Sequence, residues 1–145
     1  MTKEEVHSLL ATVLDPEASP LDPPEERHWH QLRESLGMDF PAEYVFFIES
    51  MAELSFPGDI LNVRTDGRTN GNDGVLLTYE HERAWGRWPV EMIPFYGIGN
   101  GDYFAFKRDE GASSAVYYVS HDGDRPERDA ASFEDWLRGL PEFLK

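Results

Sequence analysis

The first third of the chain carries apolar residues at intervals of three and four, which is the spacing of amphipathic helices. This spacing predicts a helix over residues 2–14, opened by a capping box. A second helix is expected to begin at Pro23, with Asp22 as its N-cap, and to end at Gly37. A third helix is expected to begin near Pro41. The chain therefore starts with a helical layer.

After residue 58 the pattern changes to short runs of β-branched and aromatic residues, bounded by Gly, Asn and Asp. These runs predict strands at residues 60–63, 75–78, 91–95, 103–107 and 116–119. Residues 79–88 are ambiguous, because their first part also fits one or two helical turns.

A final helix is predicted after Ser132, which would serve as its N-cap. The apolar face of this helix would consist of Phe133, Trp136, Leu137 and Leu140. Helices, then strands, then a helix indicate the α+β class. We expect a single domain over residues 1–145, with N-terminal helices, a mostly antiparallel sheet of about five or six strands, and a C-terminal helix.

The charge of the chain is strongly one-sided, since 13 Lys and Arg stand against 28 Asp and Glu, a formal net charge of −15. Phosphate backbones and anionic lipid headgroups would repel such a chain, so we expect neither nucleic acid nor a membrane as a partner. A basic protein would instead be attracted, through an effect on association rate that salt weakens. The alternative, that the charge only keeps the domain soluble, remains open.

The chain contains no cysteine, which excludes disulfides and thiolate metal sites. It has no apolar run of 18 residues, and its N-terminus lacks the pattern of a secretory signal. We therefore expect a cytoplasmic protein, although the lack of cysteine alone does not fix the compartment.

Several motifs that suggest chemistry fit structural roles better. Gly97-Ile98-Gly99-Asn100-Gly101-Asp102 is partly like a dinucleotide fingerprint, but a predicted strand follows it where that fingerprint needs a helix, so we interpret it as a turn between strands. The Asp-rich loops lack EF-hand spacing. No two histidines have the i, i+4 spacing of a helical zinc motif, and no nucleophile motif is present. We expect no metal, no cofactor and no catalytic residue.

Five blocks of residues together carry a family resemblance. They are Leu36-Gly37 with Phe40-Pro41-Ala42-Glu43-Tyr44, Ile93-Pro94-Phe95, Gly99-Asn100-Gly101-Asp102, Ala115-Val116-Tyr117-Tyr118 and Ser132-Phe133-Glu134-Asp135-Trp136-Leu137. Because these blocks follow one another in the order typical of the SUKH superfamily, the chain resembles that superfamily over residues 25–140. That resemblance implies a curved antiparallel sheet braced by helices. It also implies protein binding, since bacterial members are typically immunity proteins that neutralise a polymorphic toxin, and fungal relatives are cytosolic scaffolds.

Residues 79–89 are the best candidate for a binding surface, because two Trp lie within a few residues of acids and Arg. Either Trp85 or Trp88 is expected to anchor a partner, while at least one of them packs in the core. The acids expected to form the electrostatic face are Asp66, Asp73, Glu80, Glu82, Asp122 and Asp124.

These features favour an immunity-type binding protein, rather than an enzyme, that neutralises a cognate polymorphic toxin by direct contact. A basic nuclease is the favoured toxin, and a deaminase or another basic toxin fits the charge equally well. The alternatives are a cytosolic scaffold or regulatory module for endogenous proteins and, third, an uncharacterised hydrolase. We expect a monomer or a weak dimer, because an edge strand could pair two copies.

Overall fold

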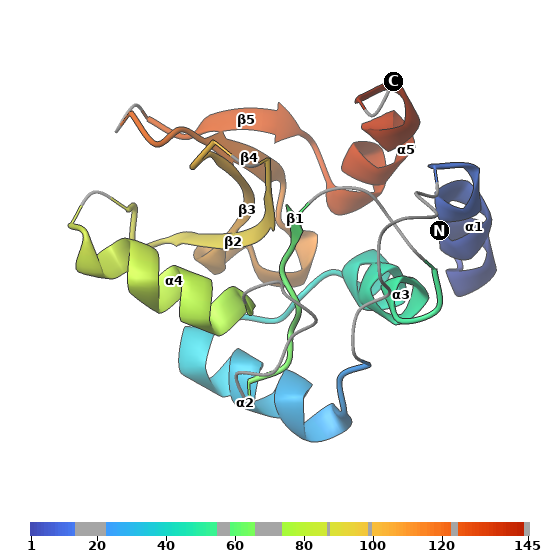
Figure 1. Ribbon diagram of the computed structural model, residues 1–145, viewed down its shortest axis with the longest axis horizontal. Helices are drawn as coiled ribbons and strands as arrows, with labels where there is room; N and C mark the ends of the chain where they lie inside the picture. Colours follow the sequence, from blue (N-terminus) through green and yellow to red (C-terminus); the bar gives the residue numbers. More distant parts are fainter. Residues whose placement is uncertain are drawn as a thin grey trace.

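Helices pack against a curved antiparallel sheet in the computed structural model (Figure 1). The structure describes residues 1–13, 23–54, 59–65, 74–86, 88–98, 100–122 and 125–143. In chain order the elements are α1 (Lys3–Leu10), the 3-10 helix η1 (Ala11–Val13), α2 (Glu26–Leu36), α3 (Ala42–Met51), β1 (Asp59–Ile60), α4 (Val75–Ala84), β2 (Met92–Gly97), β3 (Tyr103–Lys107), the 3-10 helix η2 (Arg108–Ser113), β4 (Val116–Val119), β5 (Glu127–Ala130) and α5 (Phe133–Phe143). The predicted α+β class, with N-terminal helices and a C-terminal helix, is confirmed.

The sheet has the strand order β1-β2-β3-β4-β5, and neighbouring strands are antiparallel. Four strands of full length, β2 to β5, form it, rather than the five or six that we expected, and β1 adds a two-residue pairing at one edge. The strand predicted at 60–63 is thus shortened to β1 and a single bridge between Asn62 and Gly74. β5 was not predicted, because its residues are polar and exposed.

Residues 75–78 form the first turn of α4, so the prediction of a strand there was wrong. A run of three apolar residues followed by a Thr is too short to distinguish a helix from a strand. Val75, Thr78 and Tyr79 are buried at the i, i+3, i+4 spacing of a helix that packs against β2, whereas Leu77 is exposed on the outer side. The helix therefore continues to Ala84, through the first part of the segment that the sequence left ambiguous.

The ends of the N-terminal helices follow local capping. α1 has the predicted capping box, and together with η1 it occupies most of the helix predicted over 2–14. α2 begins three residues later than predicted, because Glu25 is the N-cap and its amide donates to His28 Nδ1 at 2.9 Å. The predicted N-cap, Asp22, lies outside the described residues. Gly37 ends α2 as predicted, with a left-handed φ of 66° that favours glycine.

One aromatic cluster joins the helices to the sheet. Tyr44 of α3, Phe95 of β2 and Phe106 of β3 meet Phe133 and Trp136 of α5. The ring centroids lie 4.5 Å apart for Phe95 and Phe106, and 5.0 Å apart for Phe95 and Trp136. The predicted buried face of α5 is confirmed in full.

A bulge in β2 lets two successive residues face this core. Pro94 pairs with Ala105 and Tyr96 pairs with Phe104, so Phe95 is the extra residue. Phe95 and Tyr96 are both buried. Because a bulge bends its strand and increases the local twist, it contributes to the curvature of the sheet in Figure 1.

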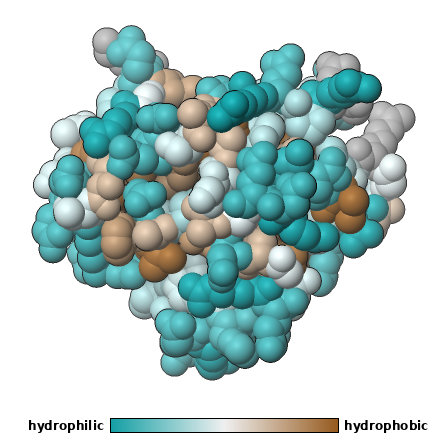
Figure 2. All heavy atoms as spheres, turned by 180° about the vertical axis from the view of Figure 1, so that it is seen from behind, coloured by the Kyte–Doolittle hydropathy of each residue, from teal (hydrophilic) through white to brown (hydrophobic). Residues whose placement is uncertain are grey.

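The outer surface combines hydrophilic and apolar areas. Seen from behind, the lower part, where α2 lies, is hydrophilic, and apolar patches lie across the middle (Figure 2). Among the described residues, the large apolar side chains that are most exposed are Leu77, Trp85, Val90 and Phe143. No helix within the described ranges has the length and apolar character needed to cross a membrane.

Replacing Phe95 by alanine is expected to lower the free energy of unfolding by about 3–5 kcal/mol, because it leaves a cavity in the aromatic cluster. Leu77→Ala is the control, and it should change the free energy of unfolding by less than about 0.5 kcal/mol because Leu77 is 53% exposed. Urea unfolding followed by circular dichroism measures both. Equal effects would contradict this placement of the core.

Candidate partner-binding face

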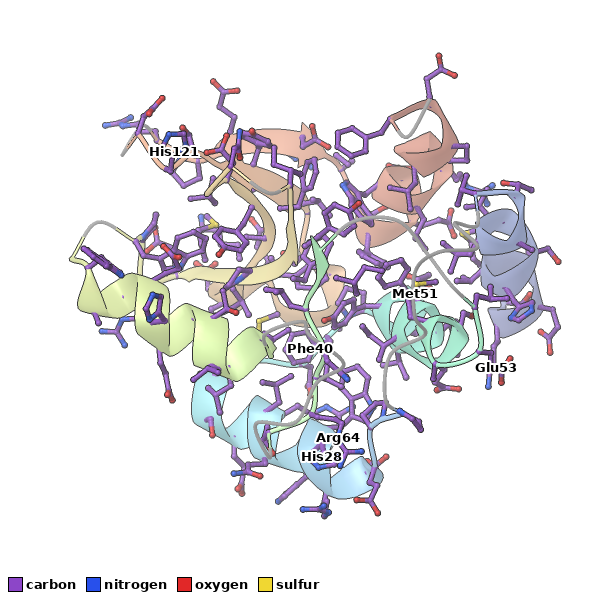
Figure 3. The ribbon with its side chains drawn as sticks, viewed as in Figure 1. His28, Phe40, Met51, Glu53, Arg64 and His121 are labelled. Carbon is purple, nitrogen blue, oxygen red and sulfur yellow. The ribbon has the colours of Figure 1, made fainter. Side chains whose placement is uncertain are left out.

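The structure places five of the eight residues that the sequence predicts for partner binding. These five come from α4, the segment that follows it and the turn after β4: Glu80, Glu82, Trp85, Trp88 and Asp122. The other three, Asp66, Asp73 and Asp124, lie outside the described residues. Figure 3 labels His121, the neighbour of Asp122, and shows it on the same side of the view as the C-terminal end of α4.

The two acids of α4 do not share a face of the helix. The side chains of two residues that are two positions apart on an α-helix point in directions about 200° apart around its axis. Glu80 is exposed, whereas Glu82 is half-buried and accepts a hydrogen bond from the Tyr103 hydroxyl at 3.4 Å. Tyr103 is the first residue of β3. The structure therefore brings Glu82, but not Glu80, against the sheet.

The two tryptophans have different environments. Trp88 is half-buried, its indole N–H donates to the Met92 carbonyl at 2.8 Å, and its ring lies edge-on to Tyr103 at 5.5 Å. Trp85 is 74% exposed, and its indole N–H donates to His81 Nε2 at 3.3 Å on the previous turn of α4. Trp88 is therefore a packing residue, and Trp85 is the one that presents apolar surface to solvent.

Asp122 lies in the turn after β4, next to a polar cluster around a buried carboxylate that the sequence did not reveal. At the centre of this cluster is Asp102, which is only 7% exposed. Its carboxylate accepts hydrogen bonds from the Tyr118 hydroxyl, from the His121 amide at 2.7 Å, and from the His121 ring, whose Nδ1 lies 2.5 Å away. The backbone N–H of Asp102 donates to Asn100 Oδ1 at 3.0 Å. The cluster thus ties the β2–β3 turn to the end of β4.

The hydrogen bonds of the cluster set the charge of its members. Burial alone would raise the pKa of Asp102, but the hydrogen bonds from Tyr118 and His121 outweigh it and lower this pKa to about 2. The bond to Asp102 raises the pKa of Tyr118 to about 12, so its hydroxyl stays protonated. The same carboxylate raises the pKa of His121, which also lies 3.3 Å from Asp122 through Nε2. The ring is held between two carboxylates, an arrangement that stabilises an imidazolium.

Gly101 permits the close approach on which the cluster depends. Its φ is +93°, and a Cβ atom at this position would lie 3.1 Å from Cβ of His121. This confirms the interpretation of the Gly-rich motif as a turn between strands. The signal for the cluster was present in that motif, but the partners of Asp102 lie 16 and 19 residues away, beyond any local spacing rule.

The fold is an α+β domain in which helices cover a curved antiparallel sheet. Over residues 3–142 the chain matches the family model described as SUKH_5, SMI1-KNR4 cell-wall, so it belongs to the SUKH superfamily. The recognition from the sequence is confirmed.

A solved structure shows the same fold. The crystal structure of a protein from Pseudomonas syringae pv. tomato superposes with a TM-score of 0.62, at 20% identity, over 94% of this chain and 96% of that one. A comparison with curated proteins gave no match. The similarity in structure establishes the fold, and the partner has to be inferred from the surface of this chain.

Asp102→Asn is expected to lower the pKa of His121 towards its ordinary value of 6.5, because the bond to Asp102 is the largest cause of the upward shift. Asp122→Asn, the matched control, should lower this pKa by less, since Asp122 acts only through its charge. Titration of the His121 ring protons by NMR measures both changes.

The sign of the associated stability follows from the raised pKa. The stability contributed by the protonated His121 is fully present below pH 6.5 and is lost as the pH rises through the folded-state pKa. Asp102→Asn should therefore flatten the dependence of stability on pH in this window. A larger effect from Asp122→Asn would show that the Asp102 bond does not control the ring.

Proposed function

We propose that this SUKH domain is an immunity-type protein that neutralises a cognate polymorphic toxin by direct binding, with a basic nuclease as the favoured toxin. The observation that carries the proposal is the exposed indole of Trp85 on the helix that also carries Glu80 and Glu82. Neither of these acids forms an ion pair with a Lys or Arg that the structure describes, so their charge is available to a basic partner. Asp122 pairs with the His121 ring at 3.3 Å and has no Lys or Arg partner within the described residues.

The net charge would act on the association rate, and the exposed Trp85 would act on the dissociation rate. A net charge of −15 attracts a basic protein over a distance of about one Debye length and raises the association rate. Slow dissociation needs buried apolar contact, which a Trp at the centre of an interface supplies. A nuclease presents a basic groove for its phosphate substrate, so an acidic protein is complementary to that groove in charge. The proposed mechanism is occlusion of that groove.

The experiment that tests the proposal has two steps. The tagged chain is used to capture proteins from its native lysate at low and high salt, and the captured protein is then purified and assayed with and without one equivalent of the chain. The proposal predicts one stoichiometric basic partner whose toxic activity the chain abolishes. Several substoichiometric partners without inhibition would instead support a scaffold for endogenous proteins.

Neutralising the three candidate acids Glu80, Glu82 and Asp122 should slow association with that partner. The variant Glu80→Gln, Glu82→Gln, Asp122→Asn is expected to reduce the association rate about tenfold at low salt and to weaken its salt dependence. The control carries the same change in charge elsewhere, on exposed acids of α2 and the residues after it: Glu26→Gln, Glu34→Gln, Asp39→Asn. Stopped-flow binding measures both. Equal association rates for the two variants would mean that the net charge, and not the position of these three acids, attracts the partner.

Trp85→Ala should act on dissociation instead. We expect a loss of about 2 kcal/mol in binding free energy, expressed as faster dissociation, with no change in the thermal stability of the free protein because the side chain is largely exposed. Leu77→Ala removes an exposed apolar side chain from the same helix and is the matched control. Surface plasmon resonance gives the two dissociation rates. An unchanged rate for Trp85→Ala would remove Trp85 from the interface.

A further inference from the structure

A groove of about 300 Å³ is lined by residues of α5 and of the β3, β4 and β5 strands. These elements lie in the upper part of Figure 1. Of the eight residues predicted from the sequence for partner binding, none of the five that the structure describes lines the groove. Its volume is at the low end of the range for ligand sites, which suits one side chain rather than a helix. The groove is therefore a separate feature that the candidate face does not account for.

The wall of the groove is aromatic. Four aromatic residues line it, and the ring centroid of Phe104 lies 5.5 Å from that of Tyr118, 5.4 Å from that of Trp136 and 5.6 Å from that of Phe143. Phe143 is half-exposed at the end of α5. The faces of aromatic rings carry negative potential and attract cations. The hydroxyl of Tyr118 is already bonded to Asp102, so this side chain is fixed in place.

A bulge in β5 adds a carboxylate to this wall. Tyr117 pairs with Arg128 and Val116 pairs with Ala130, so Asp129 is the extra residue. Bulges at sheet edges re-aim side chains, and both Asp129 and Ala130 line the groove. A regular strand would alternate the two residues between opposite faces.

Asp135 contributes a second carboxylate from α5. Within the described ranges, neither Asp129 nor Asp135 forms an ion pair. Loss of hydration raises the pKa of Asp129, and no cation offsets this effect. An apolar or anionic occupant would remove more water from both groups without replacing their hydrogen bonds, which is unfavourable. The groove therefore favours a cation.

Gly139 keeps the groove open. It lies inside α5, where glycine is less favourable than alanine. A Cβ atom at this position would meet no atom within 4 Å, so packing does not require glycine. A side chain here would project into space that the groove now occupies, because Gly139 is one of its lining residues.

We propose that this groove is the receptor pocket for an arginine side chain of a partner protein. A guanidinium stacks on aromatic rings, and its five N–H donors reach two carboxylates at once, whereas the ammonium of lysine is a compact and more strongly hydrated charge. The inference rests on the proposed function only for the identity of the partner. It names one chemical group that the partner must present.

The test uses the full chain and a small probe, Nα-acetyl-arginine methylamide. Its neutral analogue, Nα-acetyl-citrulline methylamide, is the matched control, and the lysine analogue tests the choice of cation. In 1H–15N spectra the arginine probe should shift the Trp136 indole N–H and the Gly139 amide, with a Kd on the order of 1 mM. Equal shifts from citrulline, tighter binding of the lysine analogue, or shifts confined to other regions would overturn the proposal.

Separate variants test the carboxylates of the groove and its open volume. Asp129→Asn with Asp135→Asn should weaken the arginine probe about tenfold or more, since both charged acceptors are lost. Glu134→Gln removes the neighbouring acid of α5, which does not line the groove, and should leave the Kd unchanged. Gly139→Leu should fill the groove and abolish binding while the protein remains folded, because leucine favours the helix. Retained binding in folded Gly139→Leu protein would contradict the proposal.

The outcome for the groove can be separated from the outcome for the proposed function. If the probe fails to bind but a toxin is captured and inhibited, the groove inference is wrong and the immunity proposal stands. If the probe binds as described but no captured protein is inhibited, the pocket stands and the partner is of another kind.

Discussion

The packing of Phe95 against Phe106, Tyr44, Phe133 and Trp136 is the constraint on which the rest of the structure depends. It fixes the distance between α3, the sheet and α5, because aromatic rings of this size leave little freedom in how the layers approach. α5 both closes the core and lines the groove, and its Trp136 and Leu140 belong to both. The shape of the groove therefore depends on the packing of the interior.

The elements that the sequence predicted correctly are those with a local signal. The face of α5 was found because apolar residues repeat there at helical spacing, and the end of α2 was found because Gly37 is a typical helix stop. The strands β3 and β4 were found as runs of β-branched and aromatic residues bounded by turn residues. Residues 75–78 were assigned to a strand because a run of four residues shows no period, and the packing of α4 on β2 decides their conformation. β5 lacks the burial that would have marked it.

The candidate site was predicted less completely, and the reason is physical. Trp85 and Glu82 could be named from the sequence, because aromatic and acidic residues that lie close together in a chain are visible there. Which of two tryptophans is exposed depends on tertiary contacts, such as that of Trp88 with Met92. The bulge at Asp129 is a relation between two strands, and the role of Gly139 depends on what lies opposite it, so neither has a local signature.

The outermost strand has a consequence for how the protein behaves at high concentration. β5 offers one unpaired row of backbone groups, but Glu127, Arg128 and Asp129 are exposed along it and its bulge breaks the regular spacing. β1, at the opposite side of the sheet, is only two residues long. Charged, irregular or very short borders do not template another chain. Among the described strands, neither border of the sheet is therefore a good template for pairing with a second chain.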